Sequence, residues 1–252
     1  MITQADRPRK KIPQFILVSR RFPYAYAFIP KAACSTIKVI LWRVEHEMNA
    51  SVGYLGDPMS VHLGQVRTDS PWFSPLESGY LNDIEQKLSD QVYTFSFVRN
   101  PYARVFSAYR NKILGVEKGV DNFDYLEQIG WRKSRPPTFE EFLQVVNDQN
   151  PEERNEHWKA MTDILCFTEI SYSKIYKVEN FAADISDLIK KIFSVGSTES
   201  RIATHVNATR SEEVRRESYK SSSVKMVQEI YKTDFENFGY SFDYIIDERV
   251  QA

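Results

Sequence analysis

The sequence of 252 residues is poor in cysteine, glycine and long apolar runs, and each shortage excludes a class of protein. Its two cysteines, Cys34 and Cys166, cannot build a disulfide framework, and without a C-x-x-C pair no structural zinc site is expected. Only 9 glycines beside 13% aromatic residues argue against a disordered or fibrous chain. Because no run of about 18 apolar residues occurs, no transmembrane segment is expected.

The chain also lacks an excess of charge of either sign. Its 33 basic and 34 acidic residues give a formal net charge of −1, so no nucleic-acid partner is expected and any anion site must be local. The 42% of hydrophobic residues suffice for one core, which predicts a single domain over residues 1–252 with a loose lead-in at residues 1–13. The apolar run at 15–18 is too short for a signal peptide, and a cytoplasmic protein is expected.

Segments rich in β-branched and aromatic residues alternate with segments of helical periodicity. Strands are expected at 24–29, 92–98 and 174–178. Helices are expected to begin near Ser35, Pro101, Thr138, Phe181 and Ser222. This alternation predicts an α/β fold with a central parallel sheet flanked by helices.

The first candidate site is the segment 30–36 (PKAACST) between the first strand and its helix. A helix N-terminus offers free N–H groups and a positive dipole end to a phosphate or sulfate, and small residues let the backbone approach the anion. The positions expected to contact a nucleotide are Lys31, Ala32, Ala33, Cys34, Ser35 and Thr36. The segment is not a Walker A motif, and no apolar strand ends in an aspartate suited to magnesium, so no metal is expected. Taken alone, the pattern also fits an ordinary helix start.

The second candidate site follows the strand at 92–98. Arg99 comes directly after that strand, and Ser107 lies about two helical turns further on. Ligands of open α/β sheets bind beyond the carboxyl ends of the strands, where both candidate sites fall. The guanidinium of Arg99 and the hydroxyl of Ser107 suit a phosphate, so one nucleotide with two separated phosphate groups would engage both sites.

These segments resemble the nucleotide-binding motifs of sulfotransferases that use 3′-phosphoadenosine 5′-phosphosulfate (PAPS). Residues 29–36 (IPKAACST) resemble the family's 5′-phosphosulfate loop, and residues 99–109 (RNPYARVFSAY) resemble its 3′-phosphate motif R-N-P-x-x-R-x-x-S-A-Y. Over about residues 24–242 the chain is most similar to carbohydrate sulfotransferases of the chondroitin and HNK-1 type and their bacterial relatives. Where Ala33 stands the family usually has glycine, so we expect this turn to form without a positive φ at that position.

The resemblance implies a P-loop-like three-layer fold and an enzyme of the EC 2.8.2 type. Such an enzyme moves a sulfuryl group from its co-substrate PAPS to a hydroxyl of a glycan or a small molecule, without a metal. Lys31 would neutralise charge on the leaving 5′-phosphate, while Arg99 and Ser107 would hold the 3′-phosphate. A P-loop kinase and a non-catalytic nucleotide-binding module are the alternatives. Lys31 precedes the small residues of its segment, unlike the lysine of a Walker A motif, which argues against a kinase. Nucleotide binding alone would not need a charge at the leaving oxygen, so the presence of Lys31 argues against a non-catalytic module.

A histidine is the expected base for the proton of the acceptor hydroxyl, because its ordinary pKa lies near neutral pH. His62 lies between the two motifs, where related uronyl sulfotransferases place their catalytic histidine. His157 is the alternative, and it could instead order the acceptor loop. Thr209 and Arg210 fall where sulfotransferases close a late loop over the nucleotide, and they are expected to bind it. The sequence specifies neither the acceptor nor the oligomeric state.

Overall fold

The computed structural model describes residues 13, 15–47, 72–73, 92–115, 123–193 and 218–244. His62, Thr209 and Arg210 lie outside the described residues, so their expected roles stay predictions. Within these ranges no helix is long and apolar enough to cross a bilayer.

A mixed sheet forms the centre of the described structure. Its strands are β1 (Ile16–Ser19), β2 (Tyr24–Ala27), β3 (Trp72–Phe73), β4 (Tyr93–Val98) and β5 (Lys174–Lys177), in the order β3-β1-β2-β4-β5. The three expected strands β2, β4 and β5 are parallel, which confirms the α/β prediction. The sheet also contains β1, which is antiparallel to both of its neighbours and was not expected. Only four residues join β1 to β2, and so short a connection permits only an antiparallel pair.

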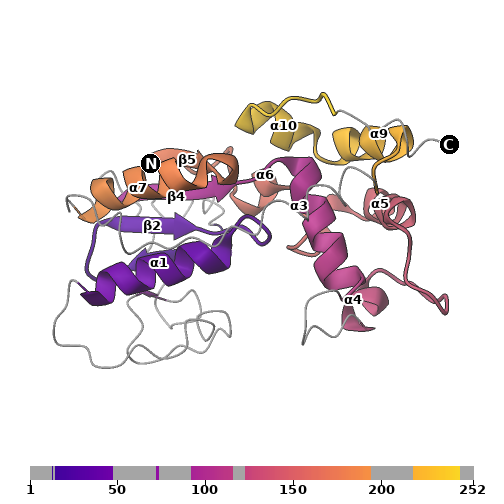
Figure 1. Cartoon of the computed structure of the whole chain (residues 1–252), viewed down its shortest axis with the longest axis horizontal. Helices are drawn as coiled ribbons and strands as arrows, with labels where there is room; N and C mark the ends of the chain where they lie inside the picture. Colours follow the sequence, from indigo (N-terminus) through magenta and orange to yellow (C-terminus); the bar gives the residue numbers. More distant parts are fainter. Residues whose placement is uncertain are drawn as a thin grey trace, which may run out of the picture.

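Helices pack beside this sheet and beyond one of its ends (Figure 1). They are α1 (Cys34–Glu47), α3 (Pro101–Ala108), the π-helix η3 (Tyr109–Ile113), α4 (Phe123–Gln128), α5 (Phe139–Asp148), η4 (Pro151–Glu153), α6 (Met161–Ile164), η5 (Val178–Asn180), α7 (Phe181–Phe193), α9 (Ser221–Ile230) and α10 (Lys232–Phe238). Two expected helix starts are confirmed by their caps. Asn100 caps α3 ahead of Pro101, and Thr138 forms a capping box with Glu141 at α5.

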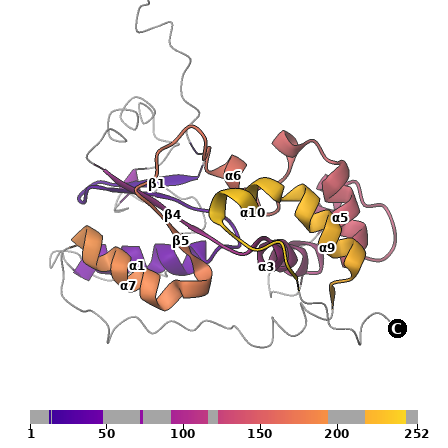
Figure 2. The same ribbon diagram turned by 90° about the horizontal axis from the view of Figure 1, so that it is seen from above.

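The two faces of the sheet bury different residues, as the alternation of side chains along a strand requires. Tyr24 and Tyr26 of β2 pack with α1 and α7 on one face, and Figure 2 shows both helices on the same side of the sheet. Ala25 and Ala27 of β2 face the other way and pack in a cluster with α6 and Phe238 of α10. The small alanine side chains leave room for these short helices against the second face.

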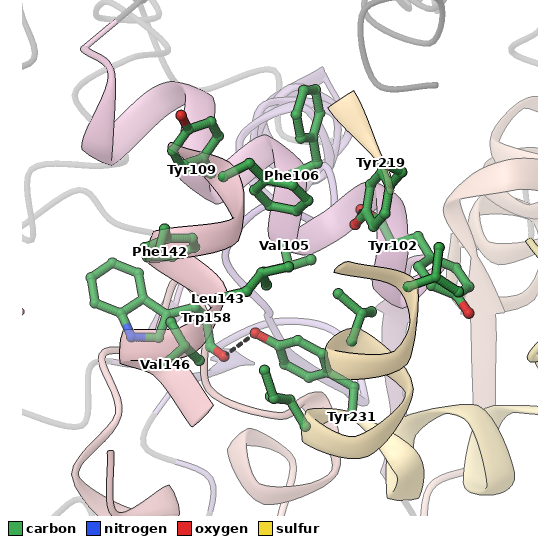
Figure 3. Packing of buried hydrophobic residues seen from close by; sticks show 14 of the residues in the cluster. Tyr102, Val105, Phe106, Tyr109, Phe142, Leu143, Val146, Trp158, Tyr219 and Tyr231 are labelled. Atoms are coloured by element: carbon green, nitrogen blue, oxygen red, sulfur yellow. Dashed lines mark hydrogen bonds between the residues drawn. The ribbon is translucent and has the colours of Figure 1, made fainter. Parts of the chain in front are cut away.

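A helical group lies beyond the carboxyl ends of β2 and β4 (Figures 1 and 2). It consists of α3, η3, α4, α5 and α9, which share an aromatic core (Figure 3). Trp158 is fully buried in this core, and the hydroxyl of Tyr231 donates a 2.6 Å hydrogen bond to its carbonyl oxygen. The segment that carries Trp158 is thereby fixed at the edge of the sheet where the candidate site residues lie.

Candidate active site

The loop between β2 and α1 contains two residues in the left-handed region of backbone conformation. Lys31 has φ = 67° and Ala33 has φ = 58°. The expectation that Ala33 would avoid a positive φ was therefore wrong: the loop keeps this conformation although alanine carries a Cβ. Such strain costs on the order of 1–3 kcal/mol and persists where the surroundings hold it. Here the Ala32 N–H donates to Ile29 and the Ile37 N–H donates to Ala33, so hydrogen bonds fix the loop on both sides.

Helix α1 begins immediately after this turn and points its first N–H groups at the loop. The amides of Cys34, Ser35 and Thr36 precede the first intrahelical bond, and among the described residues they have no backbone acceptor. The first turn of α1 contains no acidic residue. The positive end of the helix dipole and these free donors therefore form a site suited to a phosphate or sulfate group.

Arg99 brings the second motif against the first. Because β2 and β4 are parallel neighbours, their carboxyl ends lie side by side. The Nη1 of Arg99 donates a 3.0 Å hydrogen bond to the carbonyl oxygen of Lys31, across 68 residues of sequence. The prediction that both candidate sites share one edge of the sheet is confirmed.

The backbone around Arg99 is held by the third parallel strand. Directly after β5, Glu179 accepts a 2.7 Å hydrogen bond from the amide of Asn100 through Oε1. Its Oε2 accepts a 2.9 Å bond from the hydroxyl of Tyr240. These two contacts of Glu179 fix the turn from which Arg99 projects.

Arg104 is a central residue of the site that the sequence analysis did not assign. Its guanidinium is buried and donates to three backbone carbonyls: Pro30 at 3.0 Å, Lys159 at 2.7 Å and Glu156 at 2.9 Å. Burial lowers the pKa of this arginine from its ordinary value. The side chain therefore ties the loop at Pro30 to the segment 156–159. The available signal was its position as the second arginine of the R-N-P-x-x-R pattern.

Ser107 lies one turn after Arg104 on the same face of α3, as a spacing of three residues requires. It is half-buried. Because Arg104 contacts the loop at Pro30, the expected nucleotide-binding face of α3 turns toward that loop. Contact of Ser107 with a 3′-phosphate stays a prediction.

His157 occupies the segment that Arg104 holds. Burial, followed by the positive charges of Lys112, Lys31 and Arg104, lowers the pKa of His157 to about 3. Arg104 ties the carbonyls of Glu156 and Lys159, on either side of His157, to the carbonyl of Pro30, which directly precedes Lys31. The structure thus places His157 near the candidate residues of the loop after β2, whereas His62 lies outside the described residues.

Asn155 and Tyr125 flank the imidazole of His157. The Oδ1 of Asn155 lies 2.7 Å from Nδ1, and the ring of Tyr125 meets the imidazole edge-on with a centroid distance of 5.6 Å. Lys112 of η3 lies over the ring of Tyr125, with its Nζ 4.9 Å from the ring centre. The imidazole is neutral at physiological pH, which is the state that a proton acceptor needs.

Comparison with known proteins relates most of the chain to one family. A family model described as the sulfotransferase family matches residues 14–241. The chain is 28% identical over 190 residues to carbohydrate sulfotransferase 14 of Homo sapiens, which covers 72% of this chain and 47% of that protein. It is 30% identical over 193 residues to carbohydrate sulfotransferase 14 of Danio rerio (73% of this chain, 50% of that protein).

A third relative matches more of the chain. Carbohydrate sulfotransferase 11 of Rattus norvegicus is 26% identical over 244 residues, which covers 90% of this chain and 67% of that protein. The chain spans about half the length of the carbohydrate sulfotransferase 14 proteins that it matches. No solved structure matches it.

Proposed function

Because the chain belongs to the sulfotransferase family, we propose that it transfers the sulfuryl group of PAPS to a hydroxyl group of a carbohydrate. The family implies PAPS as the donor. The names of the relatives, all carbohydrate sulfotransferases, support a carbohydrate over the small-molecule alternative. The observation that carries the proposal is the hydrogen bond from Arg99 to Lys31, since it joins two anion-binding strand ends as a nucleotide with two phosphate groups requires.

The proposed roles follow from the charge that moves during the transfer. The acceptor oxygen forms a bond to sulfur while the bond from sulfur to the 5′-phosphate oxygen breaks. Negative charge then grows on that leaving oxygen, and Lys31 with the first N–H groups of α1 would stabilise it. Arg99 and Ser107 would hold the 3′-phosphate, which distinguishes PAPS from other adenine nucleotides. The products are a sulfate ester and 3′-phosphoadenosine 5′-phosphate.

The acceptor must also lose its proton, and His157 is the described residue best suited to take it. It is neutral, only 15% of its side chain is exposed, and it lies within the field of Lys31. Arg104 acts on this step as a positioning residue, since it holds the carbonyls on both sides of His157 and the carbonyl next to Lys31. His62, Thr209, Arg210 and the cytoplasmic location stay predictions.

Transfer of radiolabelled sulfate from PAPS tests this proposal. The purified protein is incubated with labelled PAPS and a panel of oligosaccharides and small hydroxyl compounds, and labelled products are separated by chromatography. We expect a labelled oligosaccharide in a reaction that Mg-ATP cannot support. Label in small compounds alone would contradict the carbohydrate acceptor, and binding of Mg-ATP in preference to PAPS would contradict the donor.

A further inference from the structure

The side chain of Asn155 makes two contacts with His157 through a single atom. Its Oδ1 accepts a 3.0 Å hydrogen bond from the backbone N–H of His157 and lies 2.7 Å from the imidazole Nδ1. Its Nδ2 donates a 2.9 Å bond to the Oε1 of Gln128 in α4. All polar atoms of the Asn155 amide are therefore engaged, and its orientation is fixed from both sides.

The backbone contact decides which hydrogen the imidazole carries. A backbone N–H can only donate, so the atom of Asn155 that faces it must be the carbonyl oxygen rather than the amide nitrogen. That oxygen can only accept, so the Nδ1 of His157 must carry the hydrogen between them. A second acceptor, Glu156 Oε1, lies 3.5 Å from the same Nδ1. In the neutral ring the lone pair is then on Nε2.

The Nε2 of His157 is the atom left for other chemistry. Among the described residues it has no hydrogen-bond partner, while Nδ1 has one on Asn155. The charged groups around the ring are Lys112 of η3, Lys31 of the β2–α1 loop and Arg104 of α3, together with Glu156 beside it. Burial, followed by the three cations, keeps the ring neutral, so Asn155 controls the tautomer of the imidazole and not its charge.

We propose that Asn155 is a positioning residue that holds His157 in its Nδ1–H tautomer, so that Nε2 takes the proton of the acceptor hydroxyl. This inference rests on the proposed sulfotransferase function. As the acceptor oxygen bonds to sulfur, its O–H bond breaks and the proton moves to the lone pair of Nε2. The electron pair of the broken bond from sulfur to oxygen leaves with the 5′-phosphate. Gln128 supports the arrangement by fixing the amide of Asn155.

Two substitutions of Asn155 separate this role from a structural one. Asn155→Ala removes the acceptor that selects the tautomer, and we expect kcat to fall by on the order of 10²-fold with little change in the KM for PAPS. Asn155→Asp keeps an oxygen acceptor for both His157 donors and adds a negative charge. We expect it to recover most of kcat and to move the acidic limb of the pH–rate profile to higher pH, because a carboxylate favours the protonated ring.

Asn150 provides a matched control in the same segment. Its Oδ1 accepts a 3.2 Å bond from the amide of Glu152 in the same kind of turn, without a histidine. We expect Asn150→Ala to leave kcat unchanged. An equal loss of kcat in Asn150→Ala and Asn155→Ala would overturn the inference, as would an Asn155→Asp variant as slow as Asn155→Ala with an unmoved acidic limb.

A spectroscopic readout keeps the inference testable without turnover. Nitrogen-15 NMR of the imidazole distinguishes protonated from unprotonated ring nitrogens, and we expect Nδ1–H and a bare Nε2 in the wild-type protein, with a mixture in Asn155→Ala. A wild-type ring protonated at Nε2 alone would overturn the inference. Failure to transfer sulfate to any acceptor, with the Nδ1–H tautomer intact, would instead count against the proposed function.

Discussion

The guanidinium of Arg99 donates a hydrogen bond to the carbonyl oxygen of Lys31, a residue that follows the neighbouring parallel strand. The contact places a cation that suits one phosphate beside the loop that suits another. Lys31 adopts a positive φ, and its carbonyl oxygen accepts the hydrogen bond from Arg99. The two halves of the proposed nucleotide site are thus built as one unit.

Lys31→Ala tests whether this lysine acts on the leaving oxygen. If its charge matters most in the transition state, kcat should fall by on the order of 10²-fold or more while PAPS affinity changes little. Steady-state kinetics with a binding titration separates the two quantities. Lys225 of α9 is exposed, and Lys225→Ala is the control that should match the wild-type protein. A rise in KM with unchanged kcat would make Lys31 an ordinary anchor of the bound nucleotide.

Ala33→Gly tests the strain in the loop. Because Ala33 has φ = 58°, glycine relieves the steric cost of its Cβ, and we expect the free energy of unfolding to rise by about 1 kcal/mol. Urea denaturation measures the difference. Ala182 is an exposed residue of helix α7, so Ala182→Gly should lower stability by about 1 kcal/mol. Destabilisation by both substitutions would show that Ala33 is not strained.

The sequence predicted those parts of the site whose contacts follow from the geometry of strands and helices. Parallel strands bring their carboxyl ends together, so Arg99 and the loop after β2 could be expected to meet. The prediction that Ala33 would avoid a positive φ was wrong, because neighbouring hydrogen bonds that fix the turn override a steric preference of about 1–2 kcal/mol. Arg104 was missed because its acceptors are 52 to 74 residues away, and no spacing rule connects an arginine to distant carbonyl groups.

Glu45, near the end of α1, should make the free energy of unfolding depend on pH. Its carboxyl is buried, accepts a hydrogen bond from the Tyr24 hydroxyl through Oε1, and has no described partner for Oε2. Desolvation raises the pKa of Glu45 from 4.5 to about 7. The unfolded chain therefore releases this proton at lower pH than the folded one. The free energy of unfolding should decline between pH 4.5 and 7, by up to about 3 kcal/mol.

Glu45→Gln should remove that decline, because glutamine keeps the oxygen that accepts from Tyr24 and does not ionise. Thermal unfolding at a series of pH values measures the slope for each protein. Glu229 of α9 is exposed, and Glu229→Gln should keep the wild-type slope. An identical slope in Glu45→Gln would contradict the raised pKa.

The pKa of His157 should depend on the bound nucleotide. In the free protein burial and the neighbouring cations lower it to about 3, so the ring stays neutral above that pH. The anionic nucleotide would offset the charge of Lys31, and its binding should raise the pKa of His157 toward the ordinary value. NMR titration of the imidazole with and without 3′-phosphoadenosine 5′-phosphate measures this, with His157→Gln to assign the signal. If the pKa of His157 is near 6.5 and does not change when the nucleotide binds, His157 does not lie at the proposed site.

The most direct test of the account is a calorimetric cycle of two nucleotides on two proteins. Arg99→Ala should weaken the binding of 3′-phosphoadenosine 5′-phosphate by about 2–3 kcal/mol, or roughly 30- to 150-fold in affinity, because a charge-assisted contact with the 3′-phosphate is lost. Adenosine 5′-phosphate has no 3′-phosphate, so its affinity should change little in the same variant. If Arg99→Ala weakens both nucleotides equally, or neither, Arg99 does not hold the 3′-phosphate and the two strand ends do not form the proposed nucleotide site.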